Sequence, residues 1–196
     1  MNSVESVREG VRQAYSAIAK HPQEESPFLT GRALAEDLGY PTHLLDTLPV
    51  TAVDAFCGIS NVSLFAEIPA EATVLDLGCG AGLDTLIAAR RTGERGKVIA
   101  IDFSKEMLTR ARQAIAEAQA TNVETHLADA EQLPVGDSRI DIAIVNGIFN
   151  LNPYRDRIFS ELVRVLRSGG AVYGAELVLT ASLSTEDQQS EAKWFH

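Results

Sequence analysis

Short apolar runs alternate with amphipathic stretches over most of the chain. The stretch at 81–92 shows the three- and four-residue spacing of apolar positions that is typical of a helix. The runs themselves are too short for buried helices and predict five strands, at about 73–77, 97–102, 123–128, 140–145 and 171–179. Strands that alternate with helices predict an α/β fold with a doubly wound parallel sheet and helices on both faces.

The first 67 residues follow a different pattern. Apolar positions that include Val11 and Ile18 recur at helical spacing, which predicts an amphipathic helix over 3–20. A loop with two prolines over 22–30 and three shorter helical stretches follow, at 31–38, 42–48 and part of 51–66. The chain therefore divides into a helical cap (1–67), a core (68–180) and a polar segment (181–196). The cap is either a lid over a ligand pocket or an addition to the outer sheet face.

Composition narrows the class of protein. The chain has 196 residues, 45% of them hydrophobic, and its net charge of −10 argues against nucleic-acid or anionic-membrane partners. No apolar run approaches the roughly 20 residues that span a bilayer, and the acidic amino terminus lacks an apolar signal region. Two cysteines make no disulfide framework. We expect a cytoplasmic enzyme without a metal site, because no His/Cys/Asp/Glu set has ligand spacing.

A glycine turn follows the first predicted strand. Gly78, Gly80 and Gly82 stand at alternate positions, where they allow a sharp turn and a close approach of ligand to backbone. Asp102 ends the second strand 22 residues after Gly80, a separation that suits a carboxylate accepting from ribose hydroxyls. This pattern predicts a nucleotide pocket at the carboxyl edge of the sheet.

The same turn departs from the dinucleotide form. Leu83 stands where G-x-G-x-x-G would have its third glycine, which disfavours a nicotinamide oxidoreductase. Asp76 and Asp84 flank the turn, and two acids suit a cationic ligand better than a diphosphate.

Five motifs in order resemble the class I S-adenosylmethionine-dependent methyltransferases, over about residues 68–180. Further similarity to arsenite methyltransferase-like enzymes lies at Tyr15 and in 55–61, 106–108, 122–124, 133–135 and 146–151. The five motifs are Asp76–Asp84, Ala100–Ser104, Leu127–Pro134, Asp141–Asn146 and Leu162–Gly170. The resemblance implies a Rossmann-like fold, S-adenosylmethionine as cofactor, S-adenosylhomocysteine as product, and a cap that acts as the lid.

The resemblance also implies roles for single residues. The glycines Gly78, Gly80 and Gly82 lie beside the cofactor's amino-acid portion and sugar, and Asp102 accepts from the ribose. Phe103 lies near the adenine; Asp129 or Glu131 accepts from its amino group, with the Ala130 N–H beside them. Asp76 and Met107 complete the set. Tyr15 closes the pocket or packs within its helix, and Asn146 lies at the methyl-transfer site, our best candidate there, or caps the following turn.

One position departs from the arsenite enzymes. They carry a cysteine directly after the asparagine at the tip of strand four, where this chain has Gly147. Trivalent arsenic selects several thiolates, and only Cys57 and Cys79 are present. Arsenite is therefore a poor candidate acceptor.

We therefore predict methyl transfer from S-adenosylmethionine to a small-molecule acceptor by in-line displacement. The alternative is a non-catalytic S-adenosylmethionine-binding module that regulates or scaffolds a partner. We expect the two strands that end the full fold to be missing, replaced or cut off in this chain, because only the polar segment 181–196 follows the fifth predicted strand. Neither the acceptor nor the oligomeric state is predicted.

Overall fold

The computed structural model describes residues 4–22 and 29–178, with side chains described from residue 8. The predicted polar segment 181–196 lies outside the described residues, as do the start of the helix predicted over 3–20, most of the loop over 22–30 and the end of the strand over 171–179.

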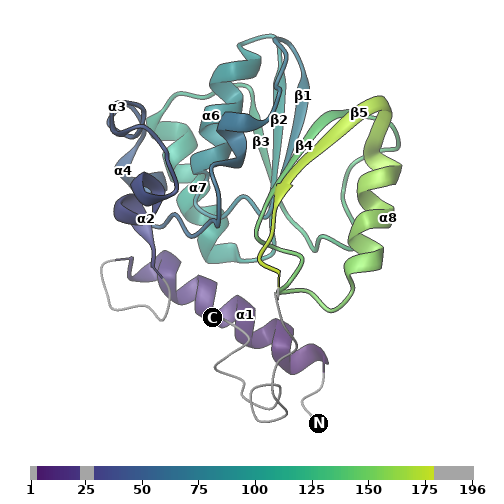
Figure 1. Cartoon of the computed structure of the whole chain (residues 1–196), viewed down its shortest axis with the longest axis horizontal. Helices are drawn as coiled ribbons and strands as arrows, with labels where there is room; N and C mark the ends of the chain where they lie inside the picture. Colours follow the sequence, from purple (N-terminus) through teal and green to yellow (C-terminus); the bar gives the residue numbers. More distant parts are fainter. Residues whose placement is uncertain (1–3, 23–28, 179–196) are drawn as a thin grey trace.

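Five parallel strands form one sheet in the order β3-β2-β1-β4-β5 (Figure 1). Helices α6, α7 and α8 connect the strands and cover both faces of the sheet, which confirms the doubly wound fold. The strands are β1 (Thr73–Leu77), β2 (Lys97–Asp102), β3 (Val123–Leu127), β4 (Ile140–Asn146) and β5 (Leu166–Ala175). The connecting helices are α6 (Leu83–Thr92), α7 (Lys105–Glu117) and α8 (Arg155–Val165).

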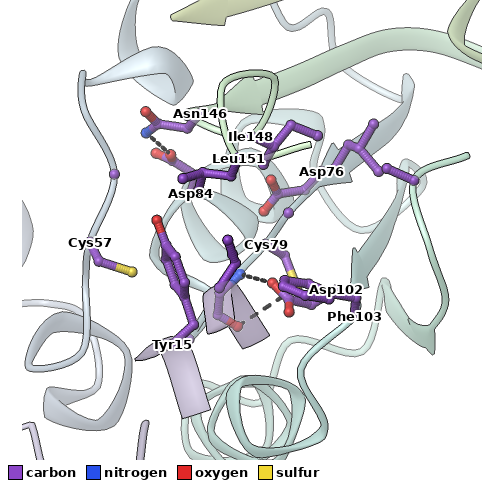
Figure 2. Close-up of a pocket in the computed structure, with 18 of the residues that line it drawn as sticks. Tyr15, Cys57, Asp76, Cys79, Asp84, Asp102, Phe103, Asn146, Ile148 and Leu151 are labelled. Atoms are coloured by element: carbon purple, nitrogen blue, oxygen red, sulfur yellow. Dashed lines mark hydrogen bonds between the residues drawn. The ribbon is translucent and has the colours of Figure 1, made fainter. Parts of the chain in front are cut away.

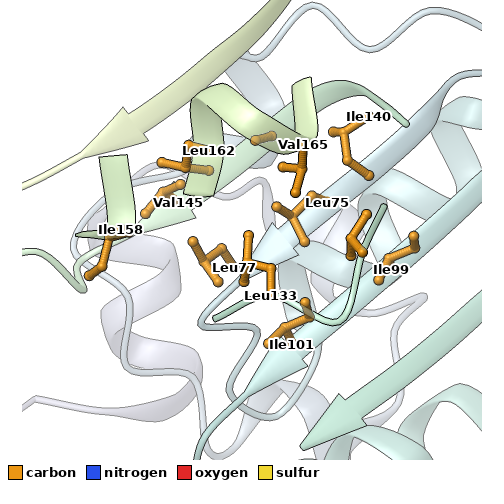
Figure 3. Close-up of a cluster of buried hydrophobic side chains, with 12 residues drawn as sticks. Leu75, Leu77, Ile99, Ile101, Leu133, Ile140, Val145, Ile158, Leu162 and Val165 are labelled. Atoms are coloured by element: carbon orange, nitrogen blue, oxygen red, sulfur yellow. The ribbon is translucent and has the colours of Figure 1, made fainter. Parts of the chain in front are cut away.

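The sheet is buried on both faces because successive residues of each central strand point to opposite sides. Leu75 and Leu77 of β1 pack with Ile158 of α8 in one hydrophobic cluster (Figure 3). Val74, which precedes Leu75 in the sequence, packs on the other face with Ala88 of α6. Continuous apolar runs such as Val98 to Ile101 therefore belong to strands that are buried on both faces of the sheet.

Strand β5 begins earlier than the sequence predicts. The pairing moves from Ile140 with Leu166 to Ile142 with Ala171, so the extra β5 residues form an irregularity inside the strand. Gly169 has φ of 80°, a conformation that glycine adopts at little cost. Residues 166–170, which the sequence places before the strand predicted over 171–179, are thus part of β5, and the strand ends earlier than predicted, at Ala175.

The amino-terminal helices divide among three places. Helices α2, α3 and α4 pack in one hydrophobic cluster with α6 and α7, through residues such as Ala35, Leu45 and Val53. Helix α5 packs with α6 and the sheet through Val62. Helix α1 lies instead across the carboxyl ends of the strands (Figure 1). The five helices are α1 (Val4–Lys20), α2 (Gly31–Asp37), α3 (Thr42–Leu45), α4 (Val50–Val53) and α5 (Val62–Phe65). None of the helices in the described residues has the length and apolar character needed to cross a membrane.

Candidate cofactor site

A cavity lies at the carboxyl ends of the strands, where the strand order reverses between β1 and β4. We call its sheet side the floor, made of residues 76–84, 102–103 and 128–131. We call the opposite side the roof, made of α1 and residues 55–60. Side chains from both sides point into the same space (Figure 2).

The glycine turn forms the centre of the floor. The N–H groups of Gly78 and Cys79 donate to the carbonyl oxygen of Ile101, at 2.8 and 2.9 Å, and so hold the turn against β2. Gly80 has φ of 52°, and a Cβ there would meet no atom within 4 Å. Its backbone is therefore open toward the cavity. Gly82 does not line the cavity; it begins α6 with φ of 94° and faces Ala111.

Asp102 ends β2 beside this turn. Its Oδ2 accepts from the Gly80 N–H at 2.9 Å (Figure 2), and its Oδ1 accepts from the Ser104 N–H at 2.8 Å. Burial raises the pKa of Asp102 to about 6, and the backbone N–H donors oppose that rise. The carboxylate is oriented by the backbone at the edge of the cavity, as the sequence spacing predicts.

Two further carboxyl groups lie in the cavity wall. Asp76 accepts from the Thr85 hydroxyl, and burial together with nearby Asp84 raises its pKa to about 8. Asp84 accepts from Ser63 and, at 2.5 Å, from the Tyr40 hydroxyl. Burial raises the pKa of Asp84, while its hydrogen bonds act in the opposite direction. A cationic group bound beside these two carboxyls would lower their pKa values, and their ionised forms would in turn stabilise it.

Asn146 lines the cavity at the tip of β4, but its amide bonds to the protein at all four positions. Its Oδ1 accepts from the N–H groups of Ile59 and Ser60 at 2.9 and 3.1 Å. Its Nδ2 donates to the Ser60 carbonyl at 2.7 Å and to Asp84 Oδ2 at 2.9 Å (Figure 2). The side chain ties the roof to β4, and a turn cap does not describe this role.

Tyr15 and Cys57 bring the roof to the same part of the cavity (Figure 2). Burial raises the pKa of the Cys57 thiol to about 12, with Asp102 adding to the effect. Burial also raises the pKa of Tyr15, followed by the charges of Cys57, Asp102 and Glu176. Both groups are therefore protonated at neutral pH.

The remaining predicted residues divide between the cavity and the core. Phe103 lines the floor together with Asp129, Ala130 and Glu131, from the loop after β3. Met107 does not line the cavity: it is fully buried, because α7 turns it toward Ile18 and Ala81.

The sequence did not predict that several other residues line the cavity, among them Arg8, Val11 and Asn152. Arg8, Val11 and Tyr15 are spaced by three and four residues, so helical spacing from Tyr15 would have found the first two. No such signal exists for Asn152. In the described part of the chain, no cluster of three His, Cys, Asp or Glu side chains could hold a metal ion.

Residues 68–196 match the family model described as a methyltransferase domain. The chain therefore belongs to this family, and its sheet has the class I S-adenosylmethionine-dependent methyltransferase fold. An arsenite methyltransferase from Halobacterium salinarum is 34% identical over 198 residues, covering 94% of this chain and 50% of the relative. A demethylmenaquinone methyltransferase from Shouchella clausii is 34% identical over 107 residues, or 54% and 45% of the two chains.

The crystal structure of an arsenic(III) S-adenosylmethionine methyltransferase from Chlamydomonas reinhardtii is also similar. It gives a TM-score of 0.63 at 26% identity and covers 85% of this chain and 57% of that chain. The chain spans about half the length of the curated relatives it matches.

Proposed function

We propose that this chain binds S-adenosylmethionine in the cavity and transfers its methyl group to a small-molecule acceptor. The observation that carries the proposal is the junction of Gly80 and Asp102. It presents an open stretch of backbone beside an oriented carboxylate, in the cavity of a chain that belongs to the methyltransferase family.

The residues of the cavity fit this cofactor. Gly80 leaves room for a ligand against the backbone, and Asp102 retains lone pairs for ribose hydroxyls. Asp76 and Asp84 line the cavity beside the turn, and a cationic group of the cofactor would stabilise their ionised forms and be stabilised by them. Phe103 and residues 128–131 would hold the adenine.

When bound, S-adenosylmethionine supplies a methyl group made electrophilic by the sulfonium. The contribution of the chain is to hold the two reactants close and to exclude water from the transfer site. Tyr15 and Cys57 cover that end of the cavity, and their raised pKa values keep both groups neutral there. We propose Asn146 as a positioning residue, because its amide is committed to the roof and to Asp84.

The acceptor that we propose is small, and arsenite is disfavoured. The two relatives named as arsenite or arsenic methyltransferases support a small acceptor in this family. In this chain a Cβ at Gly147 would lie 3.2 Å from Ile59 at φ of 80°, so the position does not suit a cysteine. Burial also raises the pKa of both thiols, Cys57 and Cys79, and a thiol is a weaker metalloid ligand than a thiolate. Cytoplasmic location stays a prediction.

Calorimetric titration with S-adenosylmethionine, S-adenosylhomocysteine and NAD tests the cofactor. We expect the two sulfur ligands to bind and NAD not to bind. Asp102→Asn should weaken binding by roughly tenfold to a hundredfold, because it removes a charged acceptor. Asp137→Asn, an exposed carboxylate away from the cavity, is the matched control and should bind as the parent does.

Binding of NAD in preference to the sulfur ligands would contradict the proposal. Transfer is then tested with methyl-labelled cofactor and a panel of small acceptors that includes arsenite with a thiol. Binding without transfer to any acceptor in the panel would favour the non-catalytic module instead.

A further inference from the structure

The two ends of helix α1 are held in different ways. At its carboxyl end, Ile18 and Ala19 are buried with Met107 in one hydrophobic cluster. Ser16 donates to Glu106 of α7 at 2.9 Å, and the Ala19 carbonyl accepts from Arg110 at 3.1 Å. This end is anchored to α7 by apolar and polar contacts together.

Toward the amino end, a single arginine reaches across the cavity. Nη2 of Arg8 lies 2.8 Å from Oδ1 of Asp129 and 3.3 Å from Oε2 of Glu131. Asp129 is exposed and Glu131 is almost buried, with side-chain exposures of 56% and 8%. The guanidinium also lies 6.0 Å from the centre of the Tyr154 ring. These ion pairs join the roof to the part of the floor formed by the loop after β3.

Opening this contact would leave no buried polar group without a partner. Glu131 also accepts from the Asn152 side chain at 2.8 Å, so it keeps a hydrogen bond when Arg8 moves away. Arg8 and Asp129 both retain access to water. The pair with exposed Asp129 is of the weak, solvent-screened kind, and the pair with the almost buried Glu131 is the longer of the two, at 3.3 Å. The contact can therefore break and re-form.

We propose that Arg8 is an ionic latch that holds the amino-terminal half of α1 closed over the cavity and controls exchange of its ligand. The anchored carboxyl end of α1 serves as the hinge. Because the same carboxylates are proposed to face the adenine, the identity of the exchanged ligand rests on the proposed function. The latch itself rests on the contacts of Arg8 alone.

Alkylation of Cys57 measures the latch without any cofactor. Cys57 lies in the roof and lines the cavity, so a small thiol reagent such as iodoacetamide that enters the cavity can reach it. Peptide mass spectrometry follows the alkylation of Cys57 with time. We expect Arg8→Gln to raise its rate by roughly threefold to tenfold. High salt should raise the alkylation rate of Cys57 in the parent protein, because it screens the ion pairs, and should leave the rate in Arg8→Gln almost unchanged.

Two further variants make the result specific. Arg12→Gln is the matched control, because Arg12 pairs with Glu9 of its own helix. This variant should leave the alkylation rate of Cys57 unchanged. Glu131→Gln keeps an acceptor for Asn152 but loses the ion pair, so it should also speed alkylation. The double variant Arg8→Gln/Glu131→Gln should differ little from Arg8→Gln, since both changes break one contact.

An unchanged rate of Cys57 alkylation in both Arg8→Gln and Glu131→Gln would overturn the latch. So would an equal increase in Arg12→Gln. Dissociation of S-adenosylhomocysteine, measured by surface plasmon resonance, should be faster in Arg8→Gln by a similar factor. If the parent chain binds no S-adenosylhomocysteine while the alkylation result holds, the proposed function fails and the latch stands.

Discussion

The floor and the roof of the cavity are built from different kinds of contact. The floor is held by backbone hydrogen bonds between neighbouring strands, such as those from Gly78 and Cys79 to Ile101. The roof is held by side chains from distant parts of the sequence, such as Asn146 to residues 59–60 and Arg8 to residues 129–131. We infer that the floor opens only when the sheet unfolds, whereas the roof can open locally.

Burial supports the same contrast. Leu75 and Ile101, which lie beneath the floor, are at most 1% exposed. In the part of α1 that lines the cavity, Val11 is buried, but Arg8 and Tyr15 are only half-buried. A binding site with a rigid floor and a less stable roof can hold a ligand in one orientation and still exchange it.

The largest effect is expected for a side chain added to the floor. Gly78→Ala places a Cβ 2.4 Å from Ile148 Cγ2 at φ of 78°. We expect the free energy of unfolding in urea to fall by about 2–4 kcal/mol, from the backbone conformation and the overlap together. Gly169→Ala is the control, because φ is 80° there and a Cβ would meet nothing within 4 Å; it should cost about 1–2 kcal/mol. Equal losses would show that the overlap with Ile148 contributes nothing.

A smaller effect is expected where the roof joins the floor. Asn146→Ala removes four hydrogen bonds and leaves the Ile59 and Ser60 backbone groups without their partner. We expect a loss of about 2 kcal/mol in the same urea experiment, because these groups are partly buried. Asn150→Ala alters a half-buried asparagine of the following loop whose side-chain hydrogen bond to the Leu177 carbonyl is exposed, and it should change stability by less than about 0.5 kcal/mol. If the two variants unfold alike, Asn146 does not tie the roof to β4.

The pH dependence of stability reports on the buried carboxyl group of Asp76 in the floor. Burial raises the pKa of Asp76 to about 8 in the folded chain from the ordinary aspartate value of 3.8, so the folded state holds a proton that the unfolded state releases. This contribution is fully present below about pH 4 and is lost as pH rises to about 8, by at most about 1.4 kcal/mol per pH unit. Asp76→Asn should therefore lose less stability than the parent between these limits, as measured by urea unfolding at each pH. Parallel curves would show that Asp76 is ionised in the folded chain.

Local patterns in the sequence were sufficient to predict the floor. The strand periods, the glycines at 78 and 80 and the acid at 102 lie within a short stretch, and parallel pairing brings β1 and β2 together. Met107 shows the limit of this reasoning. The resemblance implied a place near the cofactor for this residue, but the rotation of α7 directs it into the core.

The class of fold, the turn between β1 and α6 and the place of Asp102 could be predicted from the amino-acid sequence, because the residues involved interact along one strand or with the next strand. The partners of Asn146 and Arg8 and the bulge in β5 could be seen only in the folded chain. Their contacts join residues about 86 and 121 positions apart, or depend on the register between two strands. Such contacts are chosen by how the helices and strands come together in space, and that arrangement leaves no periodic pattern in the sequence.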